Sequence, residues 1–282
     1  MTVIIKEYAE IGGKKLAYIR QNDWSEDVIL FFHGFCGSKE YFPELPEIKD
    51  CILSFDRPGA GESEVSEYYT MEDFLKNVRT VLKSKGVKTV RLAGHSGGGY
   101  YAQVYAGMFP DEVSSLSLLS AMIPINCPST QKQISGSWKT IRFLSLKAKR
   151  FSRFYFSKMA KSINKNYDKQ LAANMKTLSE PERKFMEDDP ELIKTVILNA
   201  VNNNGLGVCY DAYAMCVKRE DPVIPKSIPV YIWHGAEDPQ VPFSVTEYYK
   251  AEYNVKEIHK IDGMGHMLYL PLWKDIIAEI SR

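Results

Sequence analysis

Residues 94–99 read GHSGGG and place one hydroxyl, that of Ser96, among four glycines. The apolar run TVRLA precedes this stretch, and the helical pattern YYAQVYAGMF follows it. A strand that reverses into a helix over a single residue strains the backbone there, and the neighbouring residues must lack a Cβ. Gly94 and Gly98 meet that steric demand. The sequence therefore predicts a sharp strand-to-helix turn that exposes the Ser96 hydroxyl beside the positive end of a helix.

Two other uses of a glycine-rich loop fit these residues less well. A P-loop requires Lys followed by Ser or Thr after its last glycine, and Tyr100 and Tyr101 stand there instead. A dinucleotide-binding loop requires G-x-G-x-x-G, and Ser96 occupies the position of its second glycine. The stretch thus favours a nucleophile at a turn over a phosphate-binding loop.

Short apolar runs alternate with helical patterns through the first 120 residues. VIIKEYAE and KKLAYIRQ are expected to form a hairpin across Gly12 and Gly13. Later runs lie at 28–34, 51–56, 87–94 and 112–121, and helical patterns separate several of them. Buried runs separated by helices are typical of a parallel sheet with right-handed crossovers.

This alternation stops between Pro124 and Pro222, where the residues are helical in pattern and rich in basic and aromatic side chains. It returns at PVYIWHGAEDPQVP, which begins at Pro229. We therefore expect one α/β core domain, made of residues 1–123 and 223–282, and a helical insertion over residues 124–222.

A serine nucleophile needs a base, and the base needs an orienting acid. His266 lies in the glycine loop DGMGHML after the last expected strand, at the sheet edge that should also carry Ser96. His266 is therefore the predicted base. The other histidines lie in apolar runs, in another loop, or beside the serine where the turn directs the side chain away: His234, His259, His33 and His95.

The acid should come from the same sheet edge. Asp238 directly follows the strand-like VYIWHG, in a loop that Pro239 and Pro242 stiffen, and it is the favoured candidate. Asp262 is the alternative, although it is close to His266 in the chain.

Attack on a carbonyl creates an oxyanion, which backbone N–H groups can stabilise. Gly97, the residue after the nucleophile, is expected to supply one of them. Phe35, in the loop HGFCGS after the VILFF run, is expected to supply the other.

These residues resemble the α/β-hydrolase superfamily along nearly the whole chain. The matching motifs are HGFCGS at 33–38, DRPGAGES at 56–63, GHSGGG at 94–99, HGAEDPQVP at 234–242 and GMGHM at 263–267. The resemblance implies a triad of Ser96, Asp238 and His266, with Phe35 and Gly97 in the oxyanion hole. It also implies a mostly parallel eight-stranded sheet and a helical cap inserted after the sixth strand.

The function expected from this site is hydrolysis of a carboxylic ester, or a thioester, of a small to medium and partly apolar substrate through an acyl-enzyme. No metal or cofactor is expected to take part. Two alternatives stay open: cleavage of a carbon–carbon or amide bond by the same triad, and a ligand receptor that keeps the scaffold without catalysis. The serine at position 96 argues against haloalkane dehalogenases and epoxide hydrolases of this fold, which place an aspartate there.

Composition adds expectations about the environment. The net charge of +1 gives no reason to expect nucleic acid as a partner. The five cysteines are odd in number and have no CxxC spacing, which predicts reduced thiols. The first residues lack the pattern of a signal peptide, and no apolar run reaches the ~18 residues that a membrane span needs. We therefore expect a soluble, cytoplasmic protein.

Charge is concentrated in one part of the insertion. Residues 131–176 contain twelve Lys or Arg and a single acid, a net charge of +11, so the remainder of the chain carries −10. Apolar residues within it recur at three- and four-residue steps, which predicts one amphipathic basic helix with its apolar face over the pocket: Ile141, Leu144, Ala148, Phe151 and Tyr155. Its basic face could attract anionic substrates or an anionic lipid surface.

Overall fold

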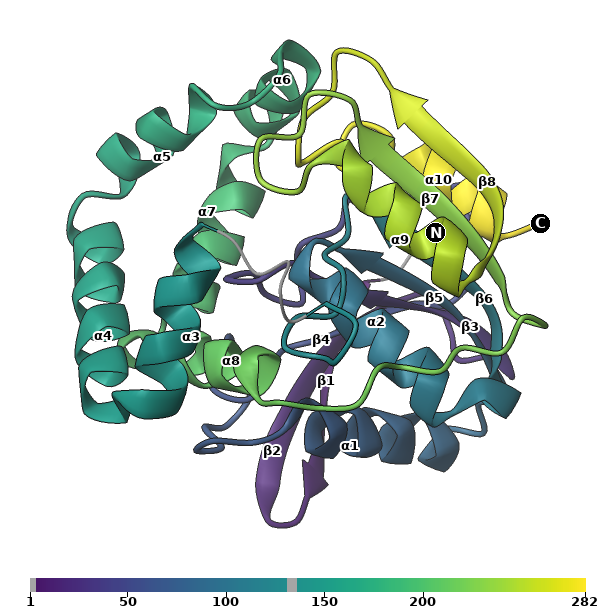
Figure 1. Cartoon of the computed structure of the whole chain (residues 1–282), viewed down its shortest axis with the longest axis horizontal. Helices are drawn as coiled ribbons and strands as arrows, with labels where there is room; N and C mark the ends of the chain where they lie inside the picture. Colours follow the sequence, from purple (N-terminus) through teal and green to yellow (C-terminus); the bar gives the residue numbers. More distant parts are fainter. Residues whose placement is uncertain (1–3, 131–135) are drawn as a thin grey trace.

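The computed structural model describes residues 4–130 and 136–282. These residues form an eight-stranded sheet in the order β1-β2-β4-β3-β5-β6-β7-β8 (Figure 1). The strands are β1 (Ile4–Ile11), β2 (Lys14–Gln21), β3 (Asp27–Phe32), β4 (Ile52–Phe55), β5 (Thr89–His95), β6 (Val113–Leu119), β7 (Pro229–Gly235) and β8 (Asn254–Ile261).

Strand direction changes only at one edge of the sheet. β1 and β2 pair as an antiparallel hairpin that closes between Ile11 and Lys14, and β2 is also antiparallel to β4. The pairs from β4 to β8 are parallel. The expected mostly parallel eight-stranded sheet with an N-terminal hairpin is therefore confirmed.

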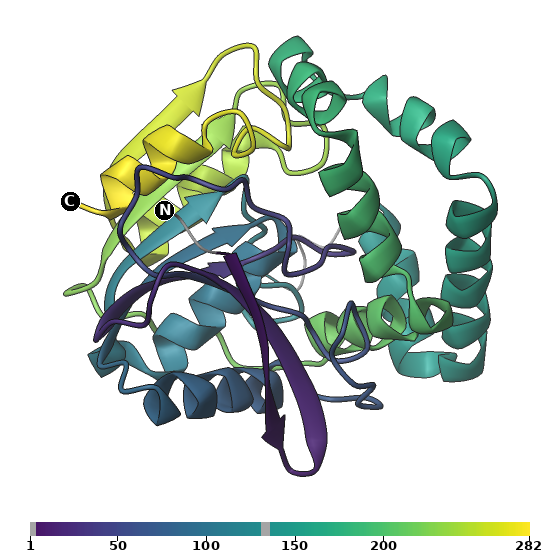
Figure 2. The same ribbon diagram turned by 180° about the vertical axis from the view of Figure 1, so that it is seen from behind.

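Helices cover both faces of the sheet. On β3, Val28, Leu30 and Phe32 join a core cluster that includes α1 (Met71–Ser84), α2 (Gly97–Met108) and α9 (Thr246–Glu252). Ile29 and Phe31 point the other way and pack with α10 (Trp273–Ile280). Figure 1 shows α1, α2 and α9 in front of the sheet, and Figure 2 shows α10, in yellow, on the opposite face. Both faces are buried, which explains the continuous apolar runs of the central strands.

Between β6 and β7 the described residues form helices and no strand. These helices arch away from one side of the sheet in Figure 1. They are α3 (Ser137–Lys147), α4 (Lys149–Lys165), α5 (Tyr167–Met175), α6 (Glu180–Asp188), α7 (Pro190–Ala200) and α8 (Leu206–Cys216). Short 3-10 turns occur at Pro110–Glu112, Asn203–Gly205 and Phe243–Val245. The helices follow the sixth strand, as expected, while the exact division into core domain and insertion stays a prediction.

The prediction of one amphipathic helix across residues 141–155 is wrong. The chain turns at Ala148 (φ −131°, ψ 51°), so α3 ends at Lys147 and α4 begins at Lys149. Phe151 and Tyr155, expected over the pocket, are exposed, and α4 instead buries Ser152, Phe156 and Ala160. Because of the break, α4 is rotated about its axis from the orientation that one unbroken helix would have. The side of α4 that packs inward therefore carries the small residues Ser152 and Ala160 beside Phe156.

Two expectations from composition can be compared with the structure. All five cysteines are free thiols, with Cys36 half-buried and the other four buried. Within residues 4–130 and 136–282, no helix combines the length and the apolar character that crossing a membrane requires.

Candidate active site

The turn at Ser96 joins the end of β5 to the start of α2. Ser96 has φ 52° and ψ −123°, a conformation that residues with a side chain rarely adopt. Backbone strain of this kind persists only where the surrounding structure enforces it, and it is common at functional sites. The strained turn predicted from GHSGGG is present.

The glycines around Ser96 are places of close backbone approach. A Cβ on Gly94 would lie 2.7 Å from the carbonyl oxygen of Gly98, and one on Gly98 would lie 2.0 Å from that of Phe32. The sequence did not single out Gly99, yet a Cβ there would lie 2.3 Å from the Cβ of Ala121. The turn is therefore packed too tightly for side chains and is not a flexible linker.

Ser96, His266 and Asp238 lie in one line of hydrogen bonds. The Ser96 Oγ is 2.9 Å from Nε2 of His266, and Nδ1 of His266 is 2.8 Å from Oδ2 of Asp238. The three side chains come from the turn after β5, the loop after β8 and the loop after β7, all at the carboxyl ends of strands. All three are buried.

Asp238 is held in a fixed orientation as a carboxylate. Its Oδ1 accepts hydrogen bonds from the backbone N–H groups of Gln240 (2.8 Å) and Val241 (2.9 Å). Burial alone would raise the pKa of Asp238, but the hydrogen bond and charge of His266, with those two N–H groups, lower the pKa below its ordinary value. At neutral pH this carboxylate is ionised and faces His266.

The other candidates for base and acid lie elsewhere. Burial and the neighbouring His266 lower the pKa of His95 to about 3, and His95 Nε2 lies 2.9 Å from the backbone oxygen of His266. A neutral imidazole makes that bond by donating from Nε2, so His95 braces the loop of His266. His234 similarly bonds the carbonyl of Val241 at 2.9 Å. Asp262 is exposed, and the structure gives it no hydrogen bond to His266.

The backbone nitrogens of Phe35 and Gly97 border the same small space. A Cβ placed on Gly97 would lie 3.2 Å from the nitrogen of Phe35. Gly97 is the first residue of α2, where N–H groups have no partner within the helix. Phe35, Ser96 and His266 also line one cavity, and Gly97 directly follows Ser96 in the chain.

Arg57 supports the loop that contains Phe35. Its buried guanidinium donates hydrogen bonds to the backbone oxygens of His33 and Gly34, the latter at 3.0 Å. It also pairs at 2.9 Å with the buried Asp211 of α8. Burial would lower the pKa of Arg57, but Asp211 raises it, so the guanidinium stays charged. This ion pair links a helix between β6 and β7 to the loop at residues 33–38, and sequence reasoning gave it no role.

Glu182 of α6 supports the loop of His266. Its Oε1 accepts a 2.7 Å hydrogen bond from the backbone N–H of Met267, and its Oε2 accepts from the N–H (2.8 Å) and hydroxyl (2.9 Å) of Ser179. Glu182 is fully buried. The pattern S-x-x-E at residues 179–182 could have indicated a helix start with a capping box. It could not have indicated the contact with Met267, which lies 85 residues away.

A cavity of about 930 Å³ opens onto Ser96 and His266. The segment between β6 and β7 supplies much of its apolar lining: Trp138, Ile141, Ile163, Leu171, Leu178, Met186, Ile193, Val196 and Ile197. Among its described lining residues there is no Lys or Arg, and the one carboxylate, Glu247, pairs with Lys250 at 2.8 Å. Cys36 also lines the cavity, but burial raises its pKa to about 12, so it stays a thiol. The cavity suits a neutral, largely apolar molecule.

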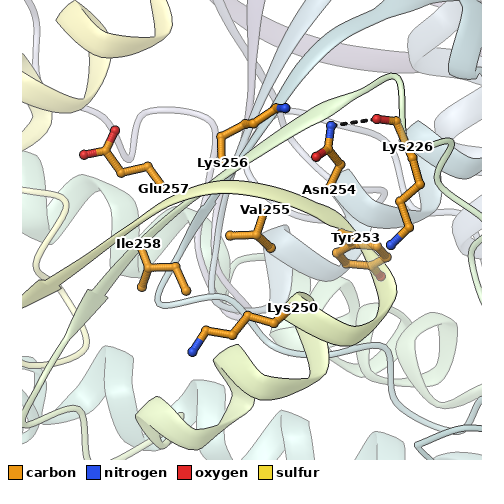
Figure 3. Close-up of a pocket in the computed structure, with 8 residues that line it drawn as sticks. All are labelled: Lys226, Lys250, Tyr253, Asn254, Val255, Lys256, Glu257 and Ile258. Carbon is orange, nitrogen blue, oxygen red and sulfur yellow. Dashed lines mark hydrogen bonds between the residues drawn. The ribbon is translucent and has the colours of Figure 1, made fainter.

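A second hollow, of about 480 Å³, lies along β8 and contains no candidate nucleophile. Figure 3 shows its lining, with Asn254 donating a hydrogen bond to the backbone oxygen of Lys226 at 2.6 Å. Lys226 and Lys250 are engaged with the oxygens of Glu252 and Glu247. The hollow shares no lining residue with the cavity at Ser96.

One group of side chains in the described part of the chain has the spacing of metal ligands. Ligand atoms of Glu257, His259 and Glu279 lie within 4.8 Å of one another. His259 already bonds Glu279 at 3.0 Å and stacks on the ring of Trp233. These residues lie on β8 and α10, apart from Ser96, and nothing in their geometry calls for a metal.

Comparison with known proteins finds a family model and several relatives that match this chain. A sequence model described as alpha/beta hydrolase fold matches residues 27–271. A probable serine hydrolase of Drosophila melanogaster is 28% identical over 151 residues, which are 50% of this chain and 45% of that protein. Lipase 1 of Psychrobacter immobilis is 28% identical over 122 residues, or 42% of this chain and 38% of the lipase. The chain thus spans less than half the length of these curated relatives.

Solved structures cover the whole chain at low sequence identity. The esterase EaEST of Exiguobacterium antarcticum superposes with a TM-score of 0.72 at 16% identity, over 99% of this chain and 100% of the esterase. A likeness at this identity establishes the fold alone.

Proposed function

The chain belongs to the α/β hydrolase fold family, and we propose that it is a serine hydrolase that cleaves a carboxylic ester through an acyl-enzyme. Its relatives include a lipase, and a solved esterase has its fold. The observation that carries the proposal is the buried line of hydrogen bonds from Ser96 through His266 to Asp238, which ends at a neutral, apolar cavity.

Acylation uses the geometry directly. Oγ of Ser96 attacks the ester carbonyl carbon while Nε2 of His266, 2.9 Å away, takes the hydroxyl proton. Asp238 holds the Nδ1 proton of His266, fixes the tautomer and stabilises the imidazolium. The N–H groups of Phe35 and Gly97 donate to the oxyanion. His266 then protonates the leaving alkoxide, and an ester of Ser96 remains.

Deacylation reverses the proton path. His266 takes a proton from a water molecule, whose oxygen attacks the acyl carbonyl on Ser96. The tetrahedral intermediate collapses, and Ser96 leaves with the proton that His266 returns to it. The products are the carboxylic acid and the free enzyme. All of these proton transfers use side chains of this chain.

The cavity supports the choice of substrate class. Its volume is within the ~300–1,000 Å³ typical of small-molecule sites, and its lining is mostly apolar. An amino-terminal peptidase would need a carboxylate enclosed at the site for the substrate ammonium, and the one carboxylate among the described lining residues, Glu247, has its side chain 71% exposed. We therefore favour an uncharged ester of medium size over a charged peptide.

Two experiments test the proposal. Ser96→Ala should lower kcat on p-nitrophenyl esters by a factor on the order of 10⁴ or more, whereas Ser114→Ala, exposed at the start of β6 and outside the cavity lining, should retain activity. Turnover by Ser96→Ala near the level of the unaltered enzyme would refute the role of Ser96. A fluorophosphonate should label Ser96, and an unlabelled serine would favour a non-catalytic receptor. Slow turnover of every ester with normal labelling would favour amide or carbon–carbon cleavage.

A further inference from the structure

The outward face of α4 exposes aromatic and cationic side chains together. Phe151, Phe154 and Tyr155 are 71%, 62% and 49% exposed. Four exposed cations lie on the same face, at steps of eight, three and four residues: Arg150, Lys158, Lys161 and Lys165. We call these seven residues the α4 surface. Figure 1 shows α4 at the outer rim of the molecule, far from the sheet.

The fold leaves this face uncovered because the opposite face of α4 is the packed one. Phe156 and Ala160 join a buried cluster with Val208 and Ala212 of α8. Two neighbouring phenylalanine rings at such exposure are costly for a helix that faces only water. Exposed apolar side chains grouped in this way mark an interaction surface more often than a solvated face.

The charge of α4 indicates which kind of partner fits. Residues 149–165 contain six Lys or Arg and no acid. None of the four cations of the α4 surface forms an ion pair with a described residue. The Nζ of Lys158 lies 5.5 Å from the ring centroid of Phe154, so a cationic group and an aromatic ring lie next to each other on this surface. An anionic phospholipid surface satisfies both, because rings enter the headgroup region while Lys and Arg side chains reach the phosphates.

A single-stranded nucleic acid could also meet rings and cations. Proteins that bind it without sequence preference usually do so in a positively charged groove that follows the strand. The α4 surface is instead one outward helix face, the geometry of an amphipathic helix lying in a membrane interface. The bilayer is therefore the partner that these residues favour.

We propose that the α4 surface binds an anionic phospholipid bilayer, with Phe151, Phe154 and Tyr155 at headgroup depth. Ile163, on another side of the same helix, lines the cavity that contains Ser96. When the protein is bound to the bilayer through the α4 surface, the cavity would lie one helix diameter, ~10 Å, from the lipid. Surface binding does not depend on the chemistry at Ser96, so it stands or falls separately from the proposed function.

Co-sedimentation of the full chain with vesicles tests this proposal. Phosphatidylcholine vesicles that contain phosphatidylglycerol should bind the protein, and vesicles of phosphatidylcholine alone should not. The triple variant K158Q/K161Q/K165Q should weaken binding about 100-fold, since each cation near the surface contributes ~1 kcal/mol and 1.4 kcal/mol is tenfold. F151S/F154S should weaken it about tenfold or more, because it removes the side chains that enter the interface. Added salt should weaken binding of the unaltered protein.

The matched control removes three exposed lysines of the core domain, K49Q/K76Q/K256Q, and should bind vesicles normally. All three variants should hydrolyse a water-soluble ester at the normal rate, which separates lost binding from lost folding. Binding to both vesicle types alike, binding to neither, or equal loss in the control would overturn the proposal. So would a preference for single-stranded RNA over vesicles, or self-association that F151S/F154S abolishes without any vesicle binding.

Discussion

The side chain of Glu182 connects α6 to the loop of His266, because its Oε1 accepts a 2.7 Å hydrogen bond from the backbone N–H of Met267. The same carboxylate accepts two hydrogen bonds from Ser179 through Oε2. A second connection, between Asp211 of α8 and Arg57, reaches the loop that contains Phe35. The helices between β6 and β7 therefore support both the proposed base and the proposed oxyanion hole, in addition to lining the cavity.

We expect Glu182→Ala to lower kcat on a soluble ester about tenfold while KM changes little, because the loop of His266 loses its anchor. Glu182 does not reach the substrate, so it is a positioning residue. The labelling rate of Ser96 with a fluorophosphonate should fall in parallel. Glu187→Ala, an exposed acid on the same helix, is the control and should leave both rates unchanged. Normal kinetics in Glu182→Ala, with a lowered Tm, would reduce Glu182 to a purely structural role.

Asp211→Asn should destabilise the protein by about 3 kcal/mol, because it leaves the guanidinium of Arg57 buried without its counter-charge. Urea unfolding measures this loss. Asp221→Asn is a suitable comparison, since Asp221 is half-exposed and accepts hydrogen bonds from Ser129. Its cost should stay below about 1 kcal/mol. Equal costs for the two variants would mean that the buried Arg57–Asp211 ion pair contributes no more to stability than the hydrogen bonds of the half-exposed Asp221.

The sequence could predict the meeting of Ser96, Asp238 and His266 because each follows a strand, and parallel strands bring their carboxyl ends to one edge. It could not predict Glu182 or the Arg57–Asp211 pair. Those contacts depend on how the helices between β6 and β7 pack against the rest of the chain, and local sequence patterns do not predict that packing.

The error over residues 141–155 has a similar cause. Periodicity shows that Phe151 and Tyr155 share a face, but it does not show whether that face is inward. The break at Ala148 decides the matter, and the buried stripe of α4 is Ser152, Phe156 and Ala160. Ser152 and Ala160 are small and allow Phe156 to pack closely against α8, while Phe151, Phe154 and Tyr155 are left outside.

Acidification should destabilise the protein as the pH falls below about 6.5, partly because of His95. Its folded pKa of about 3 lies below the ordinary value of 6.5, so the unfolded state binds the extra proton first. This contribution to stability is complete above pH 6.5 and is lost as the pH falls toward 3. At pH 5, a shift of this kind costs about 2 kcal/mol.

Urea unfolding of the unaltered protein and of His95→Gln at several pH values measures this effect. The variant should lose about 2 kcal/mol less between pH 7 and pH 5, while between pH 7 and pH 8 the two proteins should differ by a constant amount. Parallel curves down to pH 5 would show that His95 is not the group that titrates.

Gly99→Ala should destabilise the strand-to-helix turn by roughly 2–3 kcal/mol, because the new Cβ would lie 2.3 Å from the Cβ of Ala121. The shortest contact is with a side-chain atom, the Cβ of Ala121, so that partner can be removed. Ala121→Gly alone should cost about 1 kcal/mol, and the double variant should be more stable than Gly99→Ala. Gly12→Ala, where no atom lies within 4 Å but φ is +60°, reports the backbone cost alone, about 1 kcal/mol. A double variant no better than Gly99→Ala would place the conflict in the backbone of the turn, since a Cβ at residue 99 also lies 3.1 Å from the carbonyl oxygen of Gly94.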